Sequence, residues 1–235
     1  MIIKISLTVL LTIFSNSALS LTFNQAKKEL KVLYKDFPST FYCGCDIEWI
    51  SNSKLVPNPS RCGYSPRKPF TRKGNPNERA TRIEFEHVVS AYEFGHQLQC
   101  WQEGKRKHCI KTSDQFNVME GDLHNLTASL GELNNDRSNY RFGIIEGESR
   151  IYGQCDAEVD FQARVFEPRP SIRGDIARTY FYFEQRYGLK ISRKQQQLFS
   201  AWDKLDPVDS TECAIHNAKA KIQGNENPFV SRHCL

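Results

Sequence analysis

The residues best suited to chemistry lie in the run Glu84-Phe85-Glu86-His87-Val88-Val89. Here a carboxylate directly precedes a histidine, the side chain best matched to general-base work near neutral pH. A carboxylate is also a hard oxygen ligand that suits Mg²⁺. Adjacent side chains point to opposite faces of an ideal strand, so Glu86 and His87 serve one site only if the strand bends or the site straddles its end. Taken alone, the pair also fits an ordinary structural or surface role.

A second polar segment contains an asparagine beside an apolar stripe. It runs through Gly121-Asp122-Leu123-His124-Asn125-Leu126 and on through Gly131-Glu132-Leu133-Asn134-Asn135-Asp136-Arg137. Asn134 stands at the margin of the face that the leucines form. Its amide oxygen is able to complete a magnesium site, because Mg²⁺ takes few protein ligands and keeps several waters. A helix cap or a turn is the other interpretation of such an asparagine.

Two basic clusters flank the Glu86–His87 pair in the sequence. The first contains Arg67, Lys68, Arg72, Lys73, Arg79 and Arg82. The second, on or beside the segment between two cysteines, contains Lys105, Arg106, Lys107, His108 and Lys111. Solvated surface explains most such runs, but basic patches beside a hard-cation site are what a polyanionic phosphate substrate requires. The formal net charge of +5 is modest, so the distribution of charge matters more than its size.

Hydrophobic periodicity predicts the elements that must position these residues. Apolar residues recur at helical spacing over Leu21–Asp36, whereas Thr81–Ala91 holds the branched and aromatic residues typical of a strand. Leucines at steps of three and four over Leu123–Leu133 predict a helix that ends near Arg137. Within that pattern, Gly131 indicates close packing against a neighbour.

The rest of the chain is predicted to complete one α+β domain with more helix than strand. An aromatic-rich helix is predicted over Ile176–Tyr187 and another over Arg193–Trp202. Cys43–Glu78 is rich in Pro, Gly, Asn and Ser, which indicates an irregular segment stapled by disulfides. We find no interdomain linker and no internal repeat.

Residues 1–20 have the pattern of a secretory signal peptide. Lys4 is their only charge, an apolar run follows over Ile5–Phe14, and Ala18-Leu19-Ser20 supplies the small residues of a cleavage site. The run is well short of the ~20 residues that span a bilayer, which argues against a membrane anchor. The mature domain is expected to comprise residues 21–235, and the loss of Lys4 lowers its formal charge from +5 to +4.

All eight cysteines lie in the mature part. Their even number behind a signal peptide predicts four disulfides formed in an oxidising compartment. A Cys100–Cys109 bond is able to close a local loop, and a Cys213–Cys234 bond to tie down the C-terminus. The other four then pair among themselves in an order that the sequence leaves open: Cys43, Cys45, Cys62 and Cys155. A zinc site is the weaker alternative, because the closest pair has a C-x-C spacing and no second close pair completes it.

Taken together, these motifs resemble the bacterial endonuclease I family, and the resemblance covers nearly all of the mature chain. Residues that carry it are Glu86-His87-Val88-Val89, Phe94-Gly95-His96-Gln97, Cys100-Trp101, residues 119–126 and 131–137, Cys155, residues 178–182, Trp202, Gln223-Gly224-Asn225 and Asn227-Pro228-Phe229. Members of that family are periplasmic or secreted nonspecific nucleases. The resemblance therefore implies a ββα-metal, or His-Me finger, active-site motif inside the α+β domain. Ser90 stands where relatives usually have proline, and this departure is expected to loosen the turn after the strand.

Carried over residue by residue, the resemblance implies a role for each candidate. Glu86 and Asn134 bind Mg²⁺. His87 is the general base that takes a proton from water, and Arg106 binds the phosphate. Glu120 matches a position whose backbone carbonyl orients the base, a role that needs no side-chain chemistry. The implied reaction is hydrolysis in which the cation neutralises charge on the phosphate and the products carry 5′-phosphates.

The sequence therefore predicts an exported, Mg²⁺-dependent endonuclease that cuts double- and single-stranded DNA, and also RNA, through contacts with the phosphate backbone. We expect a periplasmic or secreted monomer with no membrane partner. One alternative is a secreted protein that binds polyanions without catalysis; it predicts that some candidate site residues are replaced, yet all are present. Another is a nuclease restricted to RNA, because every assigned role addresses the phosphate and not the sugar.

Overall fold

A computed structural model of the chain describes residues 21–51, 54–147 and 149–234. The signal peptide predicted over residues 1–20 lies outside the described residues. The elements are α1 (Phe23–Leu33), β1 (Asp46–Trp49), β2 (Leu55–Asn58), η1 (Glu78–Thr81), β3 (Ile83–His87), α2 (Ala91–Gly95), α3 (Gln99–Thr112), α4 (Asp114–Glu120), η2 (Leu123–Asn125), β4 (Leu126–Leu130), α5 (Gly131–Arg137), β5 (Arg141–Phe142), β6 (Glu158–Asp160), β7 (Val165–Glu167), η3 (Pro170–Ile172), α6 (Arg173–Tyr187), α7 (Arg193–Leu205), α8 (Ser210–Gln223) and α9 (Pro228–Ser231).

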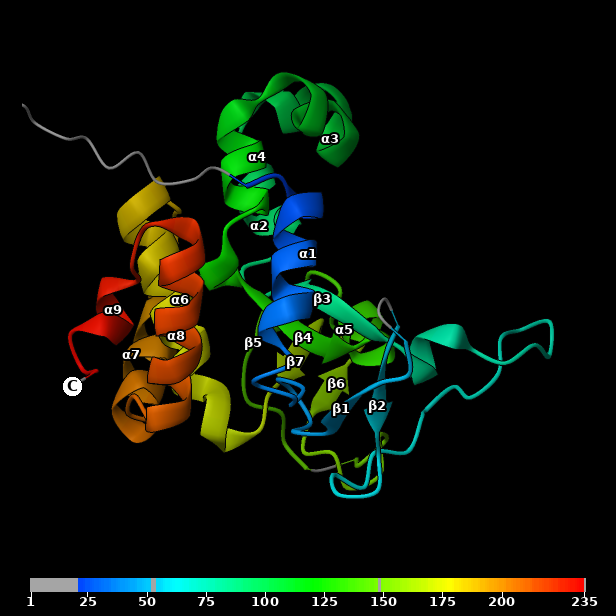
Figure 1. Cartoon of the computed structure of the whole chain (residues 1–235). Coiled ribbons are helices and arrows are strands. Elements are labelled where there is room, and N and C mark those ends of the chain that lie inside the picture. The colour runs from blue at the N-terminus through cyan, green and yellow to red at the C-terminus, as the bar shows by residue number, and fades with distance from the viewer. Residues whose placement is uncertain (1–20, 52–53, 148, 235) are drawn as a thin grey trace, which may run out of the picture.

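The helices and the small sheets occupy different sides of the molecule. Helices α6–α9 gather on one side, the strands on the other, and α2–α4 lie above them (Figure 1). The sheets are the antiparallel pairs β1–β2 and β3–β4 and the three-stranded sheet β5-β7-β6. This mixture of helices and small sheets, with helix in excess, confirms the predicted α+β class. No helix in the described residues has both the length and the apolar character needed to cross a bilayer.

The central unit is β3, β4 and α5. Strands β3 and β4 pair antiparallel, and α5 follows β4 without a loop. The helix predicted from Leu123 is therefore wrong in its first part, because Leu126–Leu130 is a strand that is buried along its whole length. The strand alternates apolar and polar residues from Leu126 to Leu130, but the four-residue step between its two leucines also matches a helical spacing that continues to Leu133. The helix begins only at Gly131.

Gly131 confirms the close packing that its place in the pattern indicates. A Cβ atom at this position would lie 2.9 Å from the backbone oxygen of Arg79. The Gly131 amide also donates a hydrogen bond to the backbone oxygen of Arg82 at 3.0 Å. The start of α5 is thereby fixed against the segment that leads into β3.

All eight cysteines form disulfides, which excludes a cysteine zinc site. The predicted Cys100–Cys109 and Cys213–Cys234 pairs are confirmed. The structure also supplies the order that the sequence left open, with Cys43 bonded to Cys155 and Cys45 bonded to Cys62. Cys45–Cys62 joins the two ends of the β1–β2 hairpin, and Cys43–Cys155 links the chain before β1 to the segment before β6. That segment is less irregular than predicted, because it contains the β1–β2 hairpin.

The Cys100–Cys109 segment is a kinked helix and not the predicted loop. Nine residues of unbroken helix rise about 13.5 Å, whereas the Cα atoms of Cys100 and Cys109 are 4.9 Å apart. The backbone of α3 therefore breaks at Gly104 and Lys105. Lys105 has φ 60° and ψ −159°, a region that is almost exclusive to glycine and is strained for other residues. This strained kink immediately precedes Arg106.

The other predicted helices are confirmed, whereas the short helices α2, α4 and α9 and the longer α8 were not predicted. Thr22 and Gln25 form a capping box that starts α1, and α6 and α7 cover the two predicted C-terminal helices. Helix α8 was not predicted, because its buried residues are His216, Lys219 and Gln223 in place of an apolar stripe.

The turn after β3 is not loosened by Ser90. The Ser90 hydroxyl accepts a hydrogen bond from the Glu93 amide at 3.2 Å, and the Glu93 carboxylate accepts one from the Ser90 amide at 3.0 Å. Ser90 is thus the N-cap of α2 in a complete capping box. The loosening expected from the missing proline is not seen, because the serine caps the next helix through these hydrogen bonds.

A small hydrophobic cluster places α1 against the central sheet. Leu30 and Leu33 of α1 are buried together with Leu126 and Ala128 of β4. Phe23, at the first turn of α1, is partly buried against the same cluster. The helix therefore lies along β3 and β4 (Figure 1), and its N-terminal turn reaches the end of β3.

Candidate active site

The structure brings all four sequence-predicted site residues to one cavity of about 690 Å³. Glu86 and His87 come from β3, Arg106 from the kinked α3, and Asn134 from α5. Cationic side chains ring the same cavity. They are Lys27, Lys31, Lys54, Arg79, Arg82 and Arg106.

Glu86 and His87 both line the cavity because the cavity runs along all of β3, from Ile83 to the end of the strand at His87. His87 is the last residue of β3 and pairs with Leu126, while Glu86 pairs with Thr127. The chain beyond β3 is fixed by Asn125. Its side chain accepts a hydrogen bond from the Val89 amide at 2.7 Å and donates one to the Val89 oxygen at 2.9 Å.

His87 is held by its Nε2 atom, which lies 2.8 Å from the backbone oxygen of Glu120. A carbonyl oxygen only accepts, so Nε2 carries the hydrogen and Nδ1 is the basic nitrogen of the neutral ring. Nδ1 makes no hydrogen bond to the described residues and is not sealed from solvent. Burial lowers the pKa of His87 to about 3, which keeps the imidazole neutral at neutral pH, as a general base requires.

Glu86 presents one oxygen to the protein and leaves the other uncommitted. The residue is 4% exposed. Its Oε1 accepts hydrogen bonds from Arg137 Nη1 at 2.9 Å and from the Tyr42 hydroxyl at 3.2 Å. Oε2 accepts none from the part of the chain described here and is not sealed from solvent. Burial raises the pKa of Glu86 to about 7 although Arg137 lowers it, so a cation beside Oε2 would favour the charged form.

Arg137 connects the end of α5 to β3. Its side chain is fully buried. Besides the bond to Glu86, Nη1 donates to the His87 oxygen at 2.8 Å and Nη2 to the Val88 oxygen at 2.6 Å. The guanidinium also lies 4.6 Å from the centre of the Phe142 ring. Sequence reasoning missed Arg137 and treated it only as the end of a helix, because its carboxylate partner is 51 residues away.

Asn134 lies on α5 one turn before Arg137. Its Nδ2 donates a hydrogen bond to Glu84 Oε2 at 3.0 Å. Glu84 in turn pairs through Oε1 with Arg82, and with Arg79 Nε at 3.4 Å. Because Glu84 fixes the amide through its nitrogen, the amide oxygen of Asn134 is left as a free acceptor.

The donor set in the cavity suits a hard cation. Among the described residues, no group of three or more His, Cys, Asp or Glu side chains is placed to hold a metal ion. A zinc site usually needs three or four such ligands, with nitrogen or sulfur prominent. A free carboxylate oxygen of Glu86 and a free amide oxygen of Asn134 instead match Mg²⁺, which keeps several waters and needs only one or two protein ligands.

Two tyrosines and an arginine from the disulfide-bonded segments brace helix α5, and a third tyrosine braces β3. Glu132 accepts from the Tyr64 hydroxyl at 2.7 Å and from the backbone amides of Arg67 and Lys68. Asp136 accepts from Arg67 Nη2 at 2.6 Å and from a second tyrosine hydroxyl at 2.8 Å. That tyrosine is Tyr152, and the third, Tyr42, reaches Glu86.

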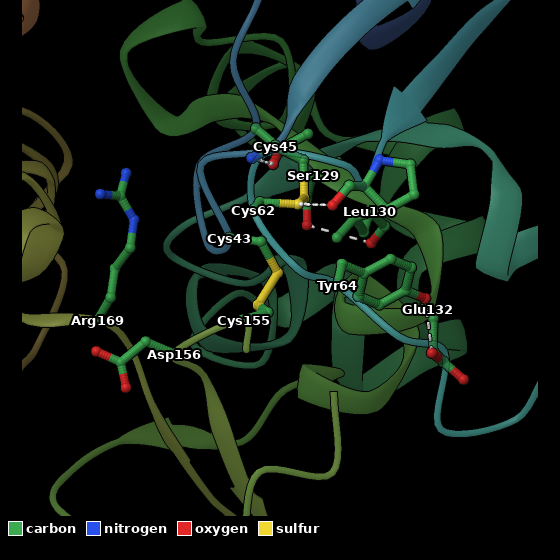
Figure 2. Close-up of a disulfide and its surroundings, with 12 residues drawn as sticks. Cys43, Cys45, Cys62, Tyr64, Ser129, Leu130, Glu132, Cys155, Asp156 and Arg169 are labelled. Carbon is green, nitrogen blue, oxygen red and sulfur yellow. Dashed lines mark hydrogen bonds between the residues drawn. A yellow bond between two sulfur atoms is a disulfide. The ribbon is translucent and has the colours of Figure 1, made fainter. Parts of the chain in front are cut away.

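Each of these tyrosines is close in sequence to a disulfide. Tyr42 precedes Cys43, and Tyr152 lies three residues before its partner Cys155. Figure 2 shows the Cys43–Cys155 and Cys45–Cys62 bonds near each other, with the Tyr64 ring directed toward Glu132. The two disulfides therefore lie close in sequence to the tyrosines that contact Glu86 and that brace α5, the helix that carries Asn134.

Arg106 is held by a second acidic contact. Its Nε donates to Glu120 Oε1 at 2.7 Å, while its two Nη groups make no hydrogen bond to the described residues. Glu120 thus acts twice, since its carbonyl holds His87 and its carboxylate holds Arg106. The resemblance implied only the first of these roles. The free Nη groups present two adjacent donors, which suits a phosphate.

Phe23 was also missed by sequence reasoning. Its ring lies 4.7 Å from the His87 ring, and the Arg106 guanidinium lies 5.6 Å from the Phe23 ring centre. We expect Phe23→Ala to lower kcat by about 10- to 100-fold, because small displacements of catalytic groups have effects of that size. Phe23→Tyr should retain most of the activity. Steady-state cleavage rates measure both.

Phe37→Ala is the matched control for this change, because Phe37 packs on the same hydrophobic cluster as Phe23. It should lower the midpoint of thermal unfolding and leave kcat near the wild-type value. An equal loss of kcat in both variants would show that Phe23 acts only through packing.

The chain is similar to a known family and to several named nucleases. A family model described as Endonuclease I matches residues 19–234. An extracellular deoxyribonuclease of Aeromonas hydrophila is 51% identical over 214 residues, which cover 91% of this chain and 90% of that protein. A periplasmic deoxyribonuclease of the same species is 47% identical over 99% of this chain and 95% of its own length. A protein named Endonuclease-1 from Buchnera aphidicola is 44% identical over 90% of this chain and 81% of its own length.

Proposed function

Because the chain belongs to the endonuclease I family, we propose that it is an exported, Mg²⁺-dependent endonuclease that hydrolyses the phosphodiester bonds of DNA without regard to sequence. The observation that carries the proposal is the content of the cavity. A basic nitrogen of His87, an oxygen each of Glu86 and Asn134, and the Nη groups of Arg106 are all uncommitted there. A ring of cations surrounds them.

We assign the ββα-metal motif to β3, β4 and α5. An antiparallel strand pair that runs directly into a helix has the order that the motif name describes. In this assignment β3 carries the base and one cation ligand, and α5 carries the other ligand. Arg137 joins the two elements through Glu86 and the backbone of β3, which supports a common rigid unit.

The proposed mechanism uses each uncommitted atom once. His87 Nδ1 takes a proton from a water molecule whose oxygen bonds to phosphorus while the P–O3′ bond breaks, and the 3′ oxygen leaves and is protonated from solvent. The Glu120 carbonyl stabilises the imidazolium that forms, because Nε2–H already points to it. The Arg106 Nη groups bind the scissile phosphate. Mg²⁺ bound by Glu86 and Asn134 supplies neutralisation of the charge on the phosphate and the leaving oxygen. Products with 5′-phosphates are expected.

The proposed substrates follow from contacts to the backbone alone. The six cations around the cavity suit phosphates, and phosphate contacts carry no sequence information directly. Double-stranded DNA, single-stranded DNA and RNA are therefore all proposed substrates. Relatives named as extracellular and periplasmic deoxyribonucleases support export. We assign export to a signal peptide at residues 1–20 and the nuclease activity to residues 21–235, acting as a monomer.

A single experiment tests the reaction. The purified, oxidised protein is incubated with plasmid DNA or with RNA, in Mg²⁺ or in EDTA, and the product ends are probed with phosphatase and kinase. We expect both polymers to be cut in Mg²⁺, with 5′-phosphate ends, and neither to be cut in EDTA. DNA binding without cleavage in any divalent cation would support the polyanion-binding alternative, and cleavage of RNA alone would restrict the substrate.

A further inference from the structure

An exposed arm projects beside the active-site cavity. All residues of Pro69–Pro76 are exposed, and Figure 1 shows this segment extending away from the body of the molecule, beyond η1. The chain that returns from the arm passes through η1 to Arg79 and Arg82, both of which line the cavity. A long substrate seated in the cavity therefore has the arm beside it.

The arm has a fixed shape. The Thr71 amide donates to the Asn75 oxygen at 2.8 Å, and the Asn77 amide donates to the Pro69 oxygen at 2.9 Å. The Asn77 side chain also donates to the Lys68 oxygen at 2.8 Å. These bonds close the segment into a narrow loop whose two sides run antiparallel to each other.

The root of the arm is fastened to the helix that carries Asn134. The amides of Arg67 and Lys68 donate to Glu132 at 3.0 and 2.8 Å, and the Arg67 guanidinium pairs with Asp136 at 2.6 Å. Glu132 and Asp136 both belong to α5. The arm and a candidate cation ligand thus share one rigid support, so the arm has a defined position relative to the scissile bond.

The arm carries cations without carboxylate partners together with an exposed ring. In the described part of the chain, Lys68, Arg72 and Lys73 form no salt bridge, unlike Arg67 at the root. Phe70 is 62% exposed, which is costly for a large apolar side chain in water. Cations that neutralise phosphates, next to an aromatic ring that packs on bases, are the combination that nucleic-acid-binding surfaces use.

We propose that this arm is a second contact for duplex DNA, outside the cleavage site. Lys68, Arg72 and Lys73 bind phosphates, and Phe70 packs on a base or sugar in the adjacent groove. The inference rests on the proposed function and adds a length requirement to it. Because the arm projects away from the body beside the cavity, duplexes that extend past the cavity are bound more tightly than short ones.

The cation part of the proposal is tested by salt dependence. The variant carries Lys68→Gln, Arg72→Gln and Lys73→Gln, and affinity is measured by fluorescence anisotropy with Ca²⁺ in place of Mg²⁺. For a duplex of about 30 base pairs, the slope of log affinity against log salt should become shallower by about 2 to 3, since each phosphate contact contributes about 0.9. For a duplex of about 8 base pairs the change should be much smaller.

The matched control removes the same charge from another surface. Arg193, Lys194 and Lys204 are exposed residues of α7, on the opposite side of the molecule from the arm in Figure 1. Their triple glutamine variant should keep the wild-type slope and cleavage rate. Equal slopes for the arm variant and this control would overturn the inference.

The role of Phe70 is tested separately, through the affinity for the long duplex. Phe70→Ala should weaken binding of the long duplex by about 5- to 100-fold, the range found when a base loses an aromatic partner, and should leave the salt slope unchanged. Phe70→Trp should bind like the wild type. Wild-type affinity for Phe70→Ala would overturn the assignment of Phe70.

The cleavage assay separates failure of the arm from failure of the nuclease proposal. If the wild-type protein cuts DNA but both arm variants bind the long duplex like the α7 control, only the inference is overturned. If the wild-type protein binds with the predicted length dependence but cuts no nucleic acid, the arm stands and the proposed reaction fails.

Discussion

His87→Ala is expected to lower kcat for DNA cleavage by at least about 100- to 10,000-fold, the usual contribution of a general base. The protein should stay folded, because within the described part of the chain the ring makes a single hydrogen bond, to Glu120, and packs on Phe23. Affinity for Mg²⁺ and for DNA should be nearly unchanged, since Glu86, Asn134 and the surrounding cations are left in place.

A substitution of Glu86 should also lower activity, but through weaker Mg²⁺ binding and not through loss of the general base. Glu86→Ala would remove the nearer of the two carboxylates that pair with the fully buried Arg137 and leave only Glu93, at 3.7 Å. Loss of a partner from a buried ion pair destabilises proteins by up to about 3–5 kcal/mol. Glu86→Gln is the better variant, because an amide oxygen can still accept from Tyr42 and Arg137 while the charge is lost. Its Mg²⁺ affinity should fall, and its activity should recover in part at high Mg²⁺. Asn134→Ala should show the same behaviour less severely.

Titration calorimetry with Mg²⁺, together with cleavage rates across Mg²⁺ concentration, separates the two roles. Thermal unfolding shows that each variant is folded. The division of roles is wrong if His87→Ala keeps a near-normal rate, or if it loses Mg²⁺ as severely as Glu86→Gln does.

The candidate site was predictable because its chemistry is concentrated in short motifs. Glu86 and His87 are adjacent, and Asn134 and Arg106 lie in motifs that carry the resemblance. The motifs do not show which other residues hold these side chains in place. Tyr42 and Arg137 contact Glu86 from 44 and 51 residues away, and no local pattern marks a tyrosine or an arginine for such a contact. Phe23 was missed for the same reason.

The errors in the fold have related physical causes. Strand β4 is a short alternation of apolar and polar residues, and its leucines are also members of a longer run at steps of three and four, from Leu123 to Leu133, so the helical spacing outweighed the strand signal. Helix α8 buries polar residues that bind distant groups, as when Lys219 donates to the Leu126 oxygen at 2.8 Å. Its burial therefore depends on tertiary partners and not on an apolar stripe. The kink of α3 depends on the Cys100–Cys109 disulfide. An unbroken helix would hold these two cysteines too far apart to form a bond, so the helix must break between them.

Loss of the Cys43–Cys155 disulfide is expected to remove most of the activity, and full reduction to abolish it. In the loop-entropy account a bond across 112 residues contributes about 5 kcal/mol, a large part of the usual net stability of about 5–15 kcal/mol. The effect on the site is additional. Tyr42 and Tyr152, which brace Glu86 and Asp136, stand beside this bond.

The Cys213–Cys234 disulfide provides the control that separates stability from site geometry. It closes a sequence separation of 21 residues at the C-terminus and is expected to contribute about 3 kcal/mol. Both double Cys→Ala variants should unfold at lower urea than the wild type. At a temperature where both are folded, the Cys213/Cys234 variant should keep a near wild-type kcat and Mg²⁺ dependence. The Cys43/Cys155 variant should need more Mg²⁺ and turn over more slowly.

That difference would tie oxidation to the assembly of the active site, and not only to survival of the fold. A chain that gains these bonds only after export would then be inactive toward nucleic acid in the reducing compartment where it is made. Equal kcat and equal Mg²⁺ dependence in the two folded variants would contradict this link and would leave the disulfides a purely stabilising role.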